Sequence, residues 1–213
     1  MDTRLYQAIW SIPTPDRIKR LPVSATGYYV PWFVAWIDRE PDFRVIGPGK
    51  LAQAVNRKLC WVCGQPLGIY KAFPIGPMCA INRNISEPPS HWECAEYAVQ
   101  GCPFLSNPRM RRNNMDLPPD HVEPAGHMIR RNPGAVGIWV TKTYSAVRLG
   151  HTGVLFRLGD PERVVWYREG RKAKRAEVEE SIETGLPELL RGGEISDAEL
   201  AGLRRRAEQY LPA

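Results

Sequence analysis

The sequence predicts an α+β fold in which small antiparallel sheets are flanked by helices. Runs rich in aromatic and β-branched residues lie at 28–46 and 136–168, and apolar residues recur at helical spacing in 174–190 and after 196. Seven tryptophans indicate a true core, and 20 prolines with 18 glycines indicate many loops. No internal repeat is evident.

The first predicted sheet element is a hairpin over residues 28–46. Its strands are expected at 28–37 and 43–46, joined by a turn. Both faces of the first strand are apolar, so we expect it to be central and covered on both sides. A helix is predicted at 49–58 and a strand at 69–75.

The next helix is predicted to begin at Ser90, directly after Pro88 and Pro89. Glu93 follows three residues later, and this S-x-x-E spacing is typical of a capping box. We therefore expect a helix over 90–101 with Ser90 as its N-cap.

The C-terminal third is predicted to return to strands and then helices. Strands are expected at 136–144, 154–158 and 164–168, with a turn at 159–161 between the last two. A helix is expected at 174–190 and a last helix capped by Ser196 and Glu199. The domain prediction is an N-terminal lobe at 1–102, with a metal module at 58–101. Two further parts are predicted: a Pro/Arg-rich loop or linker at 103–135, and a C-terminal β-hairpin with helices at 136–213.

The charge, the apolar segments and the number of cysteines indicate the cellular environment and the kind of partner that this protein has. The net charge is +6 and the pI about 9.2, which favours anionic partners, although a solvated basic surface explains the same surplus. The first twenty residues contain no apolar signal segment, and the longest apolar run, 28–37, is too short to span a bilayer. We expect a cytoplasmic protein with no membrane partner. Five cysteines, an odd number, do not indicate a disulfide framework there.

Two cysteine-containing pairs have metal-ligand spacing. Cys60 and Cys63 form a C-x-x-C that is followed by Gly64, and His91 and Cys94 lie three residues apart in the first turn of the predicted helix. A positive helix N-terminus favours the thiolate of Cys94. Three thiolates and one imidazole would form a closed structural site; a C-x-x-C redox pair beside a surface histidine is the alternative.

This arrangement resembles the treble-clef zinc finger, with its C-x-x-C-G knuckle, β-hairpin and ligand-bearing helix. The resemblance covers roughly residues 58–101 and implies that Cys60, Cys63, His91 and Cys94 bind structural Zn²⁺. Cys79 and Cys102 are the reserve ligands, either of which would replace His91. Cys102 ends the same helix, and the alternative for both is a buried free thiol. No small-molecule cofactor is expected.

A broader resemblance covers CWVCG, GPMCAINR, SEPPSHWECAEYA and CPFL. This run is similar to uncharacterised proteins of bacteria and their phages. It implies a bacterial or phage context but brings no activity with it.

Asp120 and His121, with Gly126 and Asn132 beyond them, resemble the opening of an HNH nuclease motif. In that family a histidine activates water while a divalent metal holds the phosphate. The match is partial, since Pro133 follows Asn132 and the next histidine is His151. His121 is therefore the one weak catalytic candidate, and a solvated loop histidine is the alternative.

Basic clusters supply candidate nucleic-acid contacts. They are Arg109, Arg111, Arg112, Arg130, Arg131, Arg171, Lys172, Lys174 and Arg175. Arginine and asparagine side chains on a loop are suited to phosphates and base edges. No P-loop, G-x-G-x-x-G, H-E-x-x-H or G-x-S-x-G motif is present. We expect binding rather than catalysis, with nucleic acid or a nucleoprotein complex as partner. The alternative is a protein-interaction or anti-host factor of a phage-like element.

Overall fold

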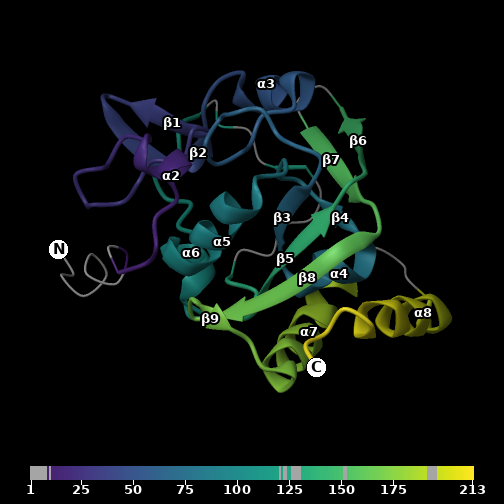
Figure 1. Cartoon of the computed structure of the whole chain (residues 1–213). Coiled ribbons are helices and arrows are strands. Elements are labelled where there is room, and N and C mark those ends of the chain that lie inside the picture. The colour runs from purple at the N-terminus through teal and green to yellow at the C-terminus, as the bar shows by residue number, and fades with distance from the viewer. Residues whose placement is uncertain are drawn as a thin grey trace.

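The computed structural model describes residues 9, 11–119, 121, 124–125, 131–150, 153–190 and 196–213. Within that part of the chain it confirms a mixed α+β fold with three small antiparallel sheets (Figure 1). The helices are α2 Asp16–Lys19, α3 Lys50–Arg57, α4 Pro77–Asn82, α5 Trp92–Gly101, α6 Pro103–Ser106, α7 Arg175–Leu190 and α8 Asp197–Glu208. The strands are β1 Val34–Ile37, β2 Glu40–Ile46, β3 Lys71–Ile75, β4 Asn84–Ile85, β5 Val136–Thr141, β6 Tyr144–Leu149, β7 Gly153–Leu158, β8 Pro161–Arg168 and β9 Arg171–Lys172.

The central sheet has the strand order β3-β5-β8-β9, and β5 is buried along its whole length. Alternate residues of a strand face opposite sides of a sheet. Val136, Ile138 and Val140 accordingly share one apolar cluster with Val99 of α5. Trp139 belongs to the cluster on the other side. Figure 1 shows α5 and α6 on one side of this sheet and α4 and α7 on the other.

The strand that is covered on both sides is therefore β5, and the prediction of a central strand at 28–37 was wrong. The hairpin itself is confirmed, but β1 begins at Val34 and pairs only with β2 in a two-stranded sheet. Trp36 and Ile37 remain 49% and 36% exposed. Only the first half of β1, Val34 and Ala35, is buried, so its apolar second half is an exposed surface rather than a doubly covered strand.

The C-terminal helices follow the predicted pattern. Val178 and Leu186 of α7 are buried, and Ala207 of α8 packs with the cluster that includes Leu186. The predicted capping box at Ser196 is present, since its side chain accepts from the Glu199 N–H and the Glu199 carboxylate accepts from the Ser196 N–H. The chemistry of this cap is local, so the sequence was sufficient to locate it.

The strand region 136–168 contains one turn more than predicted. The run from Val136 to Tyr144 is divided between β5 and β6, and β6 pairs with β7 in a sheet of order β4-β7-β6. Pairing of β3 with β5 joins residues from before and after the Pro/Arg-rich loop. The division into lobes and a linker stays a prediction.

Candidate metal centre

The knuckle containing Cys60 and Cys63 is a tight turn closed by backbone hydrogen bonds. The N–H of Gly64 donates to the carbonyl of Cys60 at 2.9 Å, and the N–H of Cys60 donates to the carbonyl of Gln65 at 2.8 Å. Gly64 has φ +71°, a left-handed conformation that favours glycine. This turn points the N–H of Cys63 at the Sγ of Cys60, 3.4 Å away.

The second pair is presented by the start of α5, but the cap differs from the prediction. His91, and not Ser90, is the N-cap, and no capping box forms. Ser90 is instead held beside β3, because its N–H donates to the Ala72 carbonyl and its carbonyl accepts from the Ala72 N–H. The helix therefore begins one residue later than expected, with His91 and Cys94 still in its first turn.

The four predicted ligands converge. The three sulfurs and the ring nitrogen of His91 all lie within 4.8 Å of one another. The Nδ1 of His91 lies 3.4 Å from the Sγ of Cys63 and 4.0 Å from the Sγ of Cys94. Ligands that surround a zinc ion tetrahedrally at about 2.3 Å are separated by roughly 3.5–4 Å. Cys60 and Cys94 are fully buried, and Cys63 and His91 are 8% and 9% exposed.

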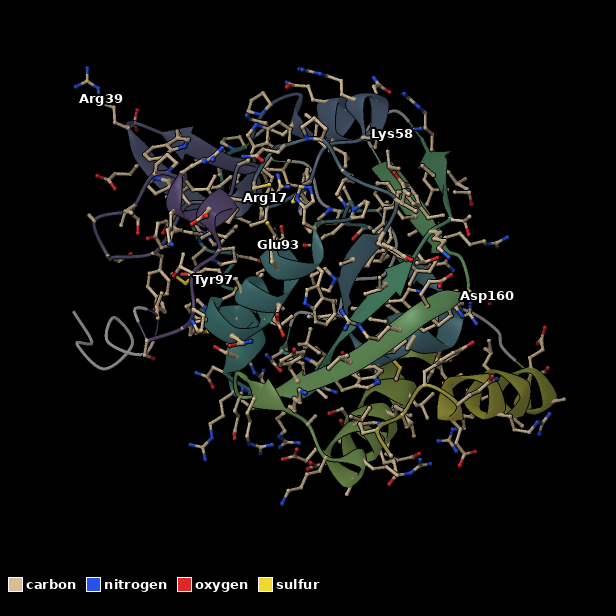
Figure 2. The ribbon with its side chains drawn as sticks, in the orientation of Figure 1. Arg17, Arg39, Lys58, Glu93, Tyr97 and Asp160 are labelled. Carbon is tan, nitrogen blue, oxygen red and sulfur yellow. The ribbon has the colours of Figure 1, made fainter. Side chains whose placement is uncertain are left out.

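Groups around the cluster orient its members. The Nε2 of His91 lies 3.0 Å from the Pro66 carbonyl oxygen, which leaves Nδ1 facing the sulfurs. The guanidinium of Arg17 in α2 forms an ion pair with Glu93 of α5 at 3.0 Å and a hydrogen bond with Gln65 in the knuckle. Figure 2 shows Arg17 and Glu93 approaching each other from these two helices. The contact of His91 with Pro66 is of the kind that metal-binding histidines commonly make with the ring nitrogen that does not bind the metal.

The four side chains of the cluster shift one another's pKa values, because they are buried together. Burial opposes ionisation of Cys60, but hydrogen bonds from Cys63, Cys94 and His91 lower its pKa below the usual range. Hydrogen bonds to Cys60 and Cys63 raise the pKa of Cys94, and hydrogen bonds to the same two residues raise that of His91 to about 10. One thiolate thus excludes further ones, and a divalent cation would allow all three to ionise.

The reserve cysteines are outside this group, which among the described residues contains only the four predicted ligands. Cys79 lies in α4 and Cys102 follows α5. Burial raises the pKa of Cys79 to about 11 and also raises that of Cys102. Both therefore have the character of neutral, partly buried thiols.

The segment between the two pairs is β3, α4 and β4, and β3 pairs with β5 rather than within a local hairpin. The segment between the knuckle and α5 therefore lacks the β-hairpin that the treble-clef resemblance implied. The resemblance to that finger, and to phage proteins, stays a prediction. Sequence reasoning also missed Arg17, Gln65 and Pro66, since their contacts join distant segments and no local motif marks them.

The predicted basic residues have different surroundings. Arg131 pairs with Glu188 and Arg171 with Glu177, both on α7. Arg175 pairs with Glu179 and Glu208. Arg112 donates to the Arg44 carbonyl on β2. Within the predicted set, the exposed side chains for which the described residues supply no ion pair are those of Arg109, Arg111, Lys172 and Lys174. Arg130 lies outside the described residues. The nucleic-acid role of this set stays a prediction.

His121 is placed by its own loop, where its Nδ1 donates to the Pro118 carbonyl at 2.9 Å. Its predicted neighbours Asp120, Gly126 and His151 lie outside the described residues. Within the described residues, the metal-capable group does not include His121, and its catalytic role stays a prediction.

The fold and the site define a small α+β protein with a buried Cys₃His cluster that could hold a metal ion. Comparison of the chain with protein-family models, curated proteins and solved structures finds no match. No helix in the described part of the chain has the length and apolar character needed to cross a membrane.

Proposed function

We propose that Cys60, Cys63, His91 and Cys94 bind one Zn²⁺ ion that stabilises the fold. The main support is that four buried side chains with sulfur or imidazole donor atoms converge on one point. The Pro66 carbonyl also orients the His91 ring so that Nδ1 faces the sulfurs. Thiolates and imidazole are the ligands that zinc prefers, and four protein ligands leave no open position for chemistry. The role is therefore structural.

Metal analysis of the purified protein tests this proposal. We expect close to one zinc per chain, and loss of that zinc in Cys60→Ser. Purified protein with no bound zinc, which also takes up none when Zn²⁺ is added under reducing conditions, would rule the site out. Iron in place of zinc would keep the site but change the cofactor.

We further propose that this metal-stabilised protein binds nucleic acid or a nucleoprotein complex. Support comes from the net charge of +6 and from exposed cations that lack an ion pair in the described residues, such as Arg109 and Lys172. Phosphate contacts release counterions, so affinity should fall steeply with salt concentration. Affinity for DNA or RNA that stays flat from low to high salt would contradict this function.

A second candidate function, a protein-interaction or anti-host factor of a phage-like element, is favoured by a different observation. Trp36, Ile37 and Phe43 of the β1–β2 hairpin are all exposed, and Ile37 and Phe43 line a groove of about 800 Å³ that faces residues 116–119. Exposed apolar groups in one place are typical of protein contacts. Recovery of a single host protein after nuclease treatment, lost in Trp36→Ala, would support it.

A further inference from the structure

The positive charge of this protein is concentrated in one stretch of the chain. Residues 43–86 contain no aspartate or glutamate and six cations: Arg44, Lys50, Arg57, Lys58, Lys71 and Arg83. The whole chain has 29 cationic and 23 acidic residues, so outside this stretch 23 cations face 23 acids. The entire surplus of +6 therefore belongs to the segment that runs from β2 through α3, the knuckle and β3 to β4.

Three of these six cations have roles inside the molecule. Arg44 pairs with Asp42, and Lys50 lies over the Trp32 ring at 4.2 Å. Arg83 pairs with Asp160. The other three have no acidic partner in the described residues, and two of them, Arg57 and Lys58, are exposed at the end of α3. Figure 2 shows Lys58 on the outside of the molecule at that end.

An exposed aromatic ring lies on the chain that leaves the knuckle. The N–H of Leu67 donates to the carbonyl of Lys58 at 2.9 Å, so the chain leaving the knuckle runs beside the end of α3. Three residues after Leu67 comes Tyr70, which is 53% exposed. The ammonium of Lys71 is held on this loop by the carbonyls of Ile69 and Lys142, at 2.8 and 3.3 Å.

Lys142 completes the surroundings of the ring. Its Nζ lies 5.4 Å from the centroid of Tyr70 and 3.1 Å from the carboxylate of Glu162. Lys142 is thus the one cation here with an acidic partner. The knuckle surface is defined by Arg57, Lys58, Tyr70, Lys71 and Lys142.

We propose that the knuckle surface binds single-stranded nucleic acid, with Tyr70 stacking on a base and the surrounding cations contacting phosphates. This inference rests on the proposed nucleic-acid function and assigns it a site. Proteins that bind single strands combine exposed aromatic rings with a positive surface, and each stacked base contributes substantially. A duplex buries the faces of its bases, so a stacking ring selects the single strand over the duplex.

The test measures binding of a fluorescent oligothymidylate and an oligouridylate of equal length, at two salt concentrations, to the zinc-loaded full chain. Tyr70→Ala should weaken binding about tenfold, whereas Tyr70→Phe, which keeps the ring, should stay near the parent. The pair Arg57→Ala with Lys58→Ala should reduce the salt slope by roughly one unit. Zinc content and thermal stability of each variant report whether the fold is intact.

The matched control removes two other exposed cations to which no binding role has been assigned, as Arg20→Ala with Arg39→Ala, which should leave single-strand affinity nearly unchanged. If the control pair weakens binding while Tyr70→Ala does not, the knuckle surface is refuted although the nucleic-acid function stands. Equal binding of a duplex of the same length also refutes it. If the parent binds no nucleic acid at low salt, both the surface and the function fail.

Discussion

The Nε2 atom of His91 lies 3.0 Å from the carbonyl oxygen of Pro66. A carbonyl only accepts hydrogen bonds, so Nε2 carries a proton, and Nδ1, which faces the sulfurs of Cys63 and Cys94, is the nitrogen that would lose its proton to bind a metal ion. The chain that leaves the knuckle therefore selects the histidine tautomer that a metal ion requires. This hydrogen bond also joins the chain beside Cys60 and Cys63 to the start of α5, which carries His91 and Cys94.

Removal of the metal should destabilise the fold. Chelation, or Cys60→Ser, should lower the free energy of unfolding by several kcal/mol, because the binding energy of a structural metal is available only to the folded chain. Thermal unfolding with and without chelator measures this. Cys79→Ala and Cys102→Ala are the matched controls, and both should retain the metal because neither sulfur belongs to the cluster. Unchanged stability after complete metal removal would contradict a structural role.

Gly64→Ala should reduce stability by about 2 kcal/mol or more, because two effects act together. The glycine has φ +71°, and an added Cβ would lie 2.5 Å from ring atoms of Trp32. Gly68→Ala is the control, since nothing lies within 4 Å of its added Cβ and its φ is outside the left-handed region. Urea unfolding compares the two variants. Equal effects at both positions would show that the packing of Trp32 against the knuckle is unimportant.

The ion pair between Arg17 and Glu93 should contribute little on its own. Their side chains are 40% and 43% exposed, so water screens the attraction. A double-mutant cycle with Arg17→Met and Glu93→Gln should give a coupling of about 0.2–1 kcal/mol in the free energy of unfolding. A coupling well above that range would mean that this pair, rather than the metal ligands, holds α2 against α5.

Glu177 should make stability depend on acid pH. A hydrogen bond from Arg171, aided by the Lys174 N–H, lowers the pKa of Glu177 to about 2 from its ordinary 4.5. A lowered folded-state pKa means that this stabilisation is present above about pH 4.5 and is lost as the pH falls toward 2. Glu177→Gln should be about 1 kcal/mol less stable than the parent near neutral pH, a value kept small by solvent screening.

Urea unfolding of the parent and of Glu177→Gln, compared with each other at every pH, checks this expectation. The gap between the two proteins should close as the pH approaches 2. Both lose bound metal in acid, so only their difference is interpreted. A gap that stays constant with pH would show that Glu177 acts through packing rather than charge.

Local chemistry explains what could be read from the sequence. The C-x-x-C-G turn, the i, i+3 placement of His91 and Cys94, the stripe of α7 and the cap of α8 each depend on residues a few positions apart. Their geometry follows from the backbone of one turn or one helix. The four residues of the buried Cys₃His cluster and the α+β class were therefore predictable.

What the tertiary structure decided concerns contacts between distant segments. Ser90 has the spacing of an N-cap, yet pairing with Ala72 on β3 takes its backbone, and His91 caps α5 instead. Strand β5 became central because β3 and β8 pair on its two edges. Arg131 pairs with Glu188, 57 residues further along the chain. The local sequence limits the contacts that a residue can make. Packing of the whole fold then selects the partner that the residue contacts.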